Sequence, residues 1–271
     1  MAAIAAMADA ETAVGAMASE LQTRTAVGLA LICIAVAALL IGGVLFWMLM
    51  AAAGVLMQGE WAGLAGADEK AKRLSMFAVS VPLAILSPLA AGPSFLALGL
   101  AAGAAIFATI AARSSVTGVG VVYVVVPILS LLLIRGGPDG LLLAFWALGL
   151  VWATDIGAYF VGRAIGGPKL APRISPSKTW AGLGGGVVAA LAFGFILSAT
   201  AGLPLRLAAA SGLLAVAAQA GDLFESWLKR RAGVKDSGNL LPGHGGVLDR
   251  LDGVVFVAPL AALLVLTPGL L

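Results

Sequence analysis

The chain has 271 residues, of which 61% are hydrophobic and only 11% are charged, and its mean hydropathy is +1.08. A soluble domain carries about 25% charged residues, so this composition excludes an ordinary soluble domain and indicates a protein of the lipid bilayer. The formal net charge is only +3, and we expect no nucleic-acid partner.

The first 24 residues are rich in alanine and contain three acidic residues, with no basic residue before Arg24. A secretory signal begins with basic residues and an organellar transit peptide lacks acidic ones, so neither pattern is met. We therefore interpret residues 1–24 as a cytosolic N-terminal tail.

Apolar blocks of the length needed to cross a bilayer follow this tail, separated by polar residues or by Gly and Pro. They predict an all-α, polytopic membrane protein with about nine transmembrane helices. The first two blocks are separated only by Gly42 and Gly43, so eight or ten spans stay open. The nine predicted spans are residues 26–42, 43–57, 76–91, 94–112, 117–134, 141–162, 181–203, 207–224 and 253–271.

With nine spans, 14 of the 16 basic residues lie on the side of the N-terminus, and only Arg135 and Arg206 lie on the other. Basic residues concentrate in cytoplasmic loops, so we expect a cytoplasmic N-terminus, in a bacterial inner (plasma) membrane. Loops 163–180 and 225–252 hold nine of the basic residues, and we expect a cytoplasm-facing polar site there. The remaining chain then divides into N-terminal transmembrane helices (25–140) and a C-terminal transmembrane catalytic region (141–271).

The stretch from Gly221 to Gly253 concentrates acidic and basic side chains in a chain that has few elsewhere. If the eighth span continues into this loop as a helix, Asp222, Ser226 and Lys229 fall on one stripe. Asp249 and Asp252 are three residues apart at the start of the ninth span. Carboxylates from two helices suit Mg²⁺, which prefers oxygen ligands and shares them with substrate phosphates.

A glycine-rich loop, Pro242 to Gly246, lies between these two helices. Its backbone amides could approach a diphosphate closely. Simpler interpretations stay open, because glycines often form turns and basic loops often contact anionic lipid. The carboxylates carry more weight, since acidic groups at membrane depth are costly and tend to be functional.

The stretch from Ser226 to Asp252 closely resembles the signature of the phosphatidate cytidylyltransferase (CDP-diacylglycerol synthase) family in residue order and spacing. Two upstream stretches, Ala153–Gly162 and Ser175–Trp180, also resemble that family. One departure is Ala181, where the family typically carries a glutamate. The signature positions are Ser226, Lys229, Arg230, Lys235, Asp236, Pro242, Gly243, His244, Gly245, Gly246, Asp249, Arg250 and Asp252.

The resemblance implies that CTP and phosphatidic acid give CDP-diacylglycerol and pyrophosphate, with Mg²⁺ as cofactor and a second cation such as K⁺ left open. It also suggests a homodimer in the membrane lipid. We expect Asp222, Asp249 and Asp252 to bind the metal, and these three with Lys229 to be catalytic. Asp155 could complete the cavity or join two helices. The residues expected to bind substrate phosphates are Lys178, Ser226, Arg230, Lys235, His244, Gly245, Gly246 and Arg250.

Two other functions stay open. A CTP-dependent polyprenol or phytol kinase would share the metal and the nucleotide but transfer the γ-phosphate. A transporter could use the intramembrane carboxylates without catalysis. The glycine-containing segment from Gly162 to Lys169 lacks the Gly-Lys-Ser/Thr ending of a phosphate loop. The glycines from Gly182 to Gly186 predict close helix packing.

Overall fold

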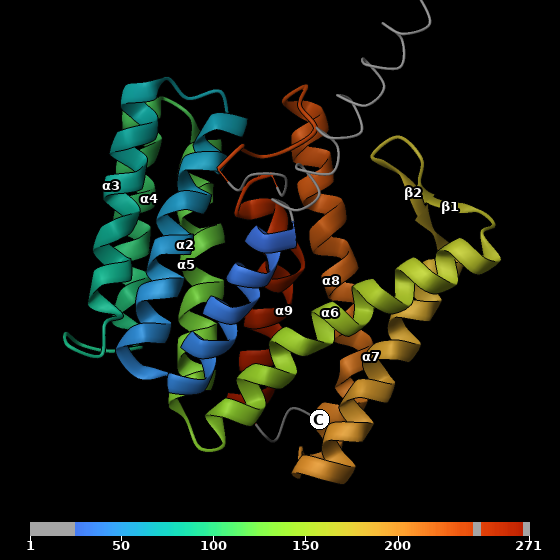
Figure 1. The fold of residues 1–271 in the computed structure, drawn as a ribbon. Helices are drawn as coiled ribbons and strands as arrows, with labels where there is room; N and C mark the ends of the chain where they lie inside the picture. The colour runs from blue at the N-terminus through green and yellow to red at the C-terminus, as the bar shows by residue number, and fades with distance from the viewer. Residues whose placement is uncertain (1–24, 241–244, 268–271) are drawn as a thin grey trace, which may run out of the picture.

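The computed structural model describes residues 25–240 and 245–267, so the predicted tail 1–24 lies outside the described residues. The described chain forms nine helices and one short hairpin (Figure 1). The first helix is Thr25–Ile41. The others are α2 (Gly43–Leu64), α3 (Glu69–Ile85), α4 (Leu96–Ala112), α5 (Ser115–Gly136), α6 (Gly140–Ile165), α7 (Trp180–Ala201), α8 (Leu205–Arg231) and α9 (Leu248–Leu266).

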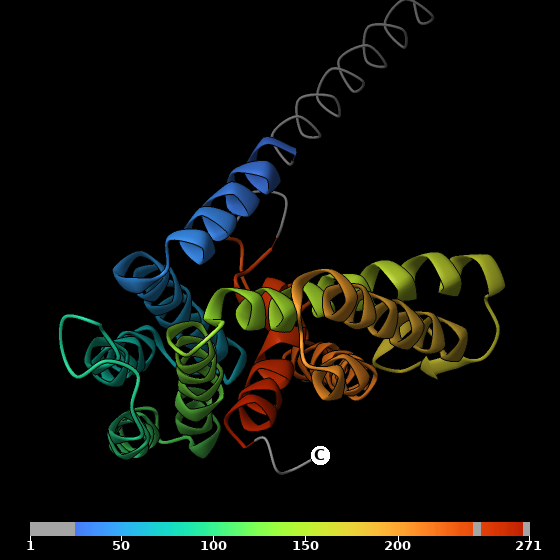
Figure 2. The ribbon, with the colours of Figure 1, turned by 90° about the horizontal axis from the view of Figure 1, so that it is seen from below.

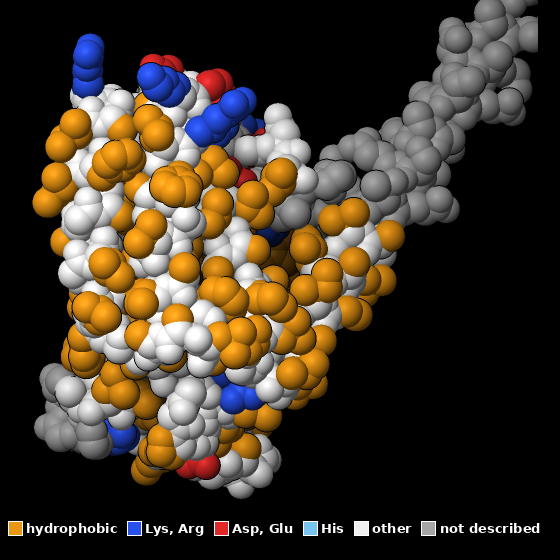
Figure 3. All heavy atoms as spheres, turned by 90° about the vertical axis from the view of Figure 1, so that its left-hand side faces the viewer, with side chains coloured by type: hydrophobic (Ala, Val, Ile, Leu, Met, Phe, Trp, Pro, Cys, Tyr) orange, Lys and Arg blue, Asp and Glu red, His pale blue; other side chains and the backbone are white. Residues whose placement is uncertain are grey.

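Each of the nine helices overlaps one predicted apolar block, although α3 and α9 begin several residues before the predicted spans 76–91 and 253–271, and this confirms the all-α, membrane-like fold. Within the described residues, five helices are long and apolar enough to cross a bilayer, namely α2, α5, α6, α7 and α8. The helices Thr25–Ile41 and α4 are apolar but shorter. Figure 3 shows a broad apolar band between the charged side chains at the two ends of the bundle.

The helices pack in two groups that meet at α9. In the first group, α5 contacts α2, α4 and α9; in the second, α6 packs along α7, and α8 packs on both α7 and α9. A buried hydrogen bond from Trp146 Nε1 to Ser211 Oγ (2.9 Å) ties α6 to α8. The predicted boundary between residues 140 and 141 stays a prediction.

Glycines allow α6 and α7 to approach closely, as the sequence predicts. A Cβ at Gly185 would lie 2.4 Å from Val161 Cβ and 2.8 Å from the carbonyl oxygen of Gly157. A Cβ at Gly186 would lie 2.9 Å from the carbonyl oxygen of Thr154. Gly184, by contrast, faces open space. Side chains at the first two positions would force the helices apart.

A small antiparallel hairpin joins α6 to α7, where the sequence predicts only a loop. It consists of β1 (Lys169–Ala171) and β2 (Ser175–Thr179), with Lys169 opposite Thr179. Its strands are short and β2 contains Pro176, so the sequence lacks the alternating apolar pattern that indicates a strand. The hairpin projects from one end of the α6–α7 pair (Figure 1) and delivers Lys178 toward the bundle.

The first helix leaves the bundle at an angle and forms a separate arm (Figure 2). Its junction with α2 is Gly42–Gly43, and both glycines have positive φ angles (+70° and +53°). Arg135, in the last turn of α5, donates from Nε to Leu39 O (2.8 Å) and from Nη2 to Leu40 O (3.1 Å). This arginine therefore fixes the end of the first helix to the bundle.

Candidate active site

Helices α8 and α9 touch at the level of the predicted carboxylates. A Cβ at Gly221 would lie 2.4 Å from the carbonyl oxygen of Asp252, so this glycine allows the contact. The conditional prediction that the eighth span continues as a helix is confirmed, because α8 runs to Arg231. Asp222 is nine residues before that end, which is about 13 Å along a helix axis. Asp222 therefore lies more than two turns inside the end of α8.

Lys178 of the hairpin reaches into this region and contacts α8. Its Nζ pairs with the carboxylate of Asp222 and donates to Gln219 Oε1 (3.0 Å). Gln219 Nε2 in turn donates to Asp155 Oδ1 (3.4 Å) on α6. The predicted loop lysine and the predicted carboxylates therefore meet, and Asp155 is joined to another helix through Gln219.

A second cluster connects the end of α8 to the start of α9. Lys229 Nζ lies 2.6 Å from Asp249 Oδ1 and 3.3 Å from Glu225 Oε1. The other oxygen of Asp249, Oδ2, accepts from the amides of Ser237 (2.9 Å) and Gly246 (2.8 Å). Asp249 precedes the predicted span 253–271. Burial raises the pKa of its carboxyl group, but the hydrogen bonds from Lys229 and the two amides have the larger effect and lower the pKa to about 2.

The two clusters lie close enough to interact electrostatically. The charges of Asp155, Asp222 and Asp252 act on one another, and the charge of Asp252 also acts on Glu225. Glu225 is buried, with 1% of its side chain exposed, and its carboxylate lies beside Lys229 (3.3 Å), Asp249 and Asp252. Five carboxylates from three helices therefore share one region with two lysines; the carboxylates are those of Asp155, Asp222, Glu225, Asp249 and Asp252.

Glu60 is a site residue to which the sequence assigned no role. Its Oε1 accepts from the amide of Val247 (2.8 Å), and its Oε2 accepts from the amide of Leu248 (2.7 Å) and from Ser237 Oγ (3.1 Å). The first amides of a helix have no partner within the helix, so Glu60 satisfies them from α2. The signal that could have found it is a lone carboxylate in an apolar helix.

The remaining predicted residues surround these clusters. Ser226 Oγ lies 3.3 Å from Asp222 Oδ1. Arg230 contacts the carbonyl oxygens of Ile174 and Val234, which joins the hairpin to the end of α8. Lys235 and Arg250 are exposed. His244 lies outside the described residues.

The predicted diphosphate loop is described only at its end. Gly245 has a φ of +80°, and a Cβ there would lie 2.8 Å from Asp249 Oδ2. The amide of Gly246 donates to that same oxygen. Both glycines therefore allow the chain to wrap around Asp249, and the Gly246 amide is engaged within the protein.

Comparison with known proteins identifies the family of this chain. The model of the cytidylyltransferase family matches residues 22–267, which include every helix described above. The chain belongs to the cytidylyltransferase family. A relative from Brucella suis biovar 1, named phosphatidate cytidylyltransferase, is 43% identical over 249 residues, which are 89% of this chain and 92% of the relative.

Two shorter matches carry the same name. The Bacillus subtilis protein is 51% identical over 123 residues, covering 44% of this chain and 46% of that protein. The Haemophilus influenzae protein is 48% identical over 127 residues, covering 44% of each chain. The names of these bacterial relatives agree with the family that the sequence resembles.

The carboxylate oxygens of this site are the kind of ligand that a hard divalent cation such as Mg²⁺ prefers. Among residues 25–240 and 245–267, no three acidic, histidine or cysteine side chains are placed to bind a metal by themselves. Mg²⁺ commonly takes only one or two protein carboxylates and completes its shell with waters and substrate phosphates. The buried Glu225 carboxylate and its acidic neighbours, which outnumber the two lysines beside them, fit that mode of binding.

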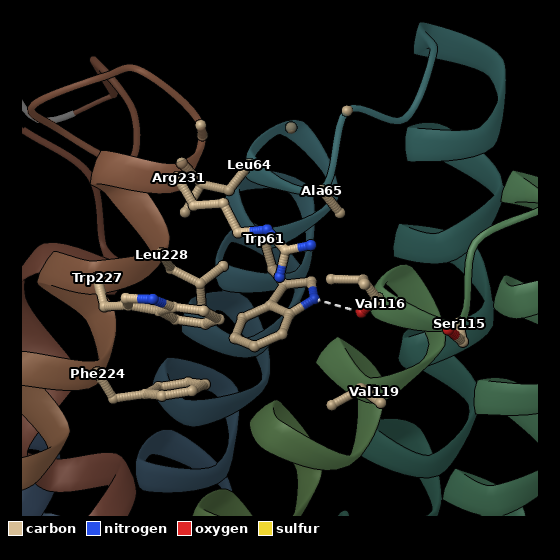
Figure 4. Close-up of a pocket in the computed structure, with 13 residues that line it drawn as sticks. Trp61, Leu64, Ala65, Ser115, Val116, Val119, Phe224, Trp227, Leu228 and Arg231 are labelled. Atoms are coloured by element: carbon tan, nitrogen blue, oxygen red, sulfur yellow. Dashed lines mark hydrogen bonds between the residues drawn. The ribbon is translucent and has the colours of Figure 1, made fainter.

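An aromatic pocket of about 510 Å³ is lined by Trp61, Phe224 and Trp227 (Figure 4). By helical spacing, its α8 residues are on the other face of that helix from Asp222. Trp61 forms one wall, with Nε1 donating to the carbonyl oxygen of Val116 (2.7 Å). Phe224 and Trp227 stack along α8, and the Arg231 guanidinium lies 5.6 Å from the Trp227 ring centroid. This packing holds α8 against α2 and α5, and so fixes the helix that carries Asp222.

Proposed function

We propose that this chain is a phosphatidate cytidylyltransferase that converts CTP and phosphatidic acid into CDP-diacylglycerol and pyrophosphate. The observation that carries the proposal is the group of carboxylates and lysines on α6, α8, α9 and β2 inside the bundle. The family membership and the printed names of the Brucella and Bacillus relatives support it.

In the proposed reaction a phosphate oxygen of phosphatidate attacks the α-phosphorus of CTP. A new bond forms between that oxygen and the α-phosphorus, and the bond from the α-phosphorus to the oxygen bridging to the β-phosphorus breaks. Pyrophosphate leaves with the electron pair of that bond. The attacking phosphate is already ionised at neutral pH, so no strong general base is needed.

The protein must therefore bring two anions together and align them. Lys178 and Lys229 are partly buried and would neutralise phosphate charge in a region of low dielectric. Lys178 sits on the hairpin and would approach the nucleotide from the aqueous side. Further phosphate contacts are proposed for Ser226, Arg230, Lys235, His244, Gly245, Gly246 and Arg250.

Mg²⁺ is the proposed cofactor, and a second cation such as K⁺ is compatible with the number of carboxylates. Asp222, Asp249 and Asp252 would hold it, and Lys178 and Lys229 keep the first two in place. When bound, the cation would neutralise charge on the phosphates. Asp222, Asp249, Asp252 and Lys229 are the proposed catalytic residues.

We further propose that all nine helices cross or enter a bacterial inner membrane, with the N-terminus in the cytoplasm. The positive-inside rule supports this orientation, since 14 of the 16 basic residues would lie on the cytoplasmic side. The proposed assembly is a homodimer, as the family resemblance implies.

The test uses the purified full-length chain in detergent micelles with α-labelled CTP and Mg²⁺. We expect label to enter the lipid fraction when phosphatidate is present. Diacylglycerol with the same acyl chains is the matched control, and it should take up no label because it lacks the attacking phosphate. If no label enters lipid with phosphatidate, the proposed function is wrong.

A further inference from the structure

An apolar groove of about 1090 Å³ lies between the first helix, α2, α6 and α9. Ligand pockets for small molecules usually occupy about 300–1,000 Å³, so this groove is large enough for an extended lipid. Among the described residues that line it, only Asp139 and Arg250 are charged. Figure 3 shows a hollow between the arm of the first helix and the body of the bundle.

We propose that this groove holds the acyl chains of phosphatidate during the reaction, and this assignment rests on the proposed function. Each helix contributes one stripe of apolar side chains to the groove. On α2 the stripe includes Phe46, Met50 and Ala53, spaced four and three residues apart. Such stripes match a hydrocarbon ligand that lies along the helices.

The groove adjoins the start of α9, which also carries site residues: the groove lies on one side of this helix and Asp249 and Asp252 lie on the other. Val247, Leu251 and Val254 line the groove. Asp249 contacts Lys229 of α8, so the start of α9 contributes residues to both the groove and the charged cluster. Arg250, a proposed phosphate ligand in the same turn of α9, lines the groove and links it to the site.

Arg250 makes the polar end of the groove suitable for an anionic lipid. It is exposed and lines the groove within the same turn as Asp249. The opposite end of the groove is at Asp139 and Gly140. Along α6 the lining extends from Gly140 to Trp152, about 18 Å at about 1.5 Å per residue.

The first helix forms the outer wall of this groove, and its attachment suggests how a lipid enters. Arg135 holds its C-terminal end through the carbonyl oxygens of Leu39 and Leu40. A Cβ at Gly43 would meet nothing within 4 Å, so the junction with α2 is loosely packed on that side. The wall is therefore fixed at one end, and a lipid could enter from the bilayer beside it.

Photo-crosslinking tests this proposal without turnover. The full-length chain in phosphatidylcholine nanodiscs is exposed to phosphatidate that carries a diazirine in one acyl chain, with no CTP, and labelled peptides are identified by mass spectrometry. We expect label in Thr25–Ile41 and α2, displaced at least tenfold better by unlabelled phosphatidate than by added phosphatidylcholine. Label spread over α3 and α4, or displaced equally by both lipids, would overturn the groove assignment.

A matched pair of variants sharpens the test. Ala52 is exposed and lines the groove, whereas Ala102 is exposed on α4 and does not line it. Ala52→Trp should reduce specific crosslinking severalfold, and Ala102→Trp should leave it unchanged. Unchanged crosslinking in Ala52→Trp contradicts the proposal. If wild-type chain crosslinks in the groove but forms no CDP-lipid, the proposed function fails while the lipid groove stands.

Discussion

Lys229 and Asp249 join the end of α8 to the start of α9, with Nζ 2.6 Å from Oδ1. Their side chains are only 14% and 8% exposed, so both charges are largely removed from water. The pair brings the signature lysine and the signature aspartate together, although 20 residues separate them in the chain. It also fixes the point at which α9 begins.

Asp249→Asn should destabilise the protein by about 3 kcal/mol, because breaking a buried ion pair leaves a buried charge without its partner. Unfolding in detergent measures this loss. Adding Lys229→Met in the same chain should restore part of the stability but none of the transferase activity. A double variant with the full sum of the two single losses would argue against a direct pairing.

Glu60→Gln should destabilise the protein by about 1–3 kcal/mol, because a neutral amide with one acceptor oxygen cannot serve both helix amides equally well. Activity should fall as well, since Glu60 positions the start of α9. Glu69→Gln is the matched control, because Glu69 is 76% exposed and forms only a 3.7 Å ion pair with Lys72. That control should change stability by less than about 0.5 kcal/mol. Equal effects of the two variants would remove the capping role of Glu60.

Lys178→Met should lower the rate of cytidylyl transfer by at least about 100-fold, because a cation that neutralises phosphate charge is lost from a partly buried site. The labelled-CTP assay measures this rate. Lys169 lies on the same hairpin and is exposed, so Lys169→Met should keep wild-type activity. If Lys178→Met also keeps it, Lys178 only fastens the hairpin.

Gly185→Ala should destabilise the α6–α7 pair by about 1–3 kcal/mol, because its Cβ would overlap Val161 and the Gly157 backbone. Gly184→Ala should be neutral or slightly stabilising, since a Cβ there meets no atom within 4 Å. Thermal unfolding of the two variants side by side measures the difference. Equal midpoints would show that the close approach at Gly185 is not required.

The helices could be predicted from the sequence because each needs a long apolar block, and such blocks stand out in a chain with few charges. The ends of the helices were less predictable. The span predicted to end at residue 57 continues to Leu64, because the polar residues that follow have partners: Gln58 is buried against α5, and the half-buried Glu60 bonds to the start of α9. Gln58, for example, donates to the carbonyl oxygen of Thr117 (3.2 Å).

The site was predictable in part. The spacing of Asp222, Ser226 and Lys229 predicts one helical face, and α8 confirms it. The pairing of Lys178 with Asp222 could not be read from the sequence, because it depends on a hairpin that folds back over α8. Glu60 is 187 residues from Val247, and nothing in the local sequence of either segment indicates that they meet.

The most direct measurement follows both ends of CTP in parallel reactions of the full-length chain with phosphatidate and Mg²⁺. With α-labelled CTP, label should enter lipid; with γ-labelled CTP, an equal amount should be released as pyrophosphate. Asp222→Asn should abolish both. Transfer of the γ-label to lipid, or a wild-type rate in Asp222→Asn, would contradict cytidylyl transfer at this cluster of carboxylates and lysines.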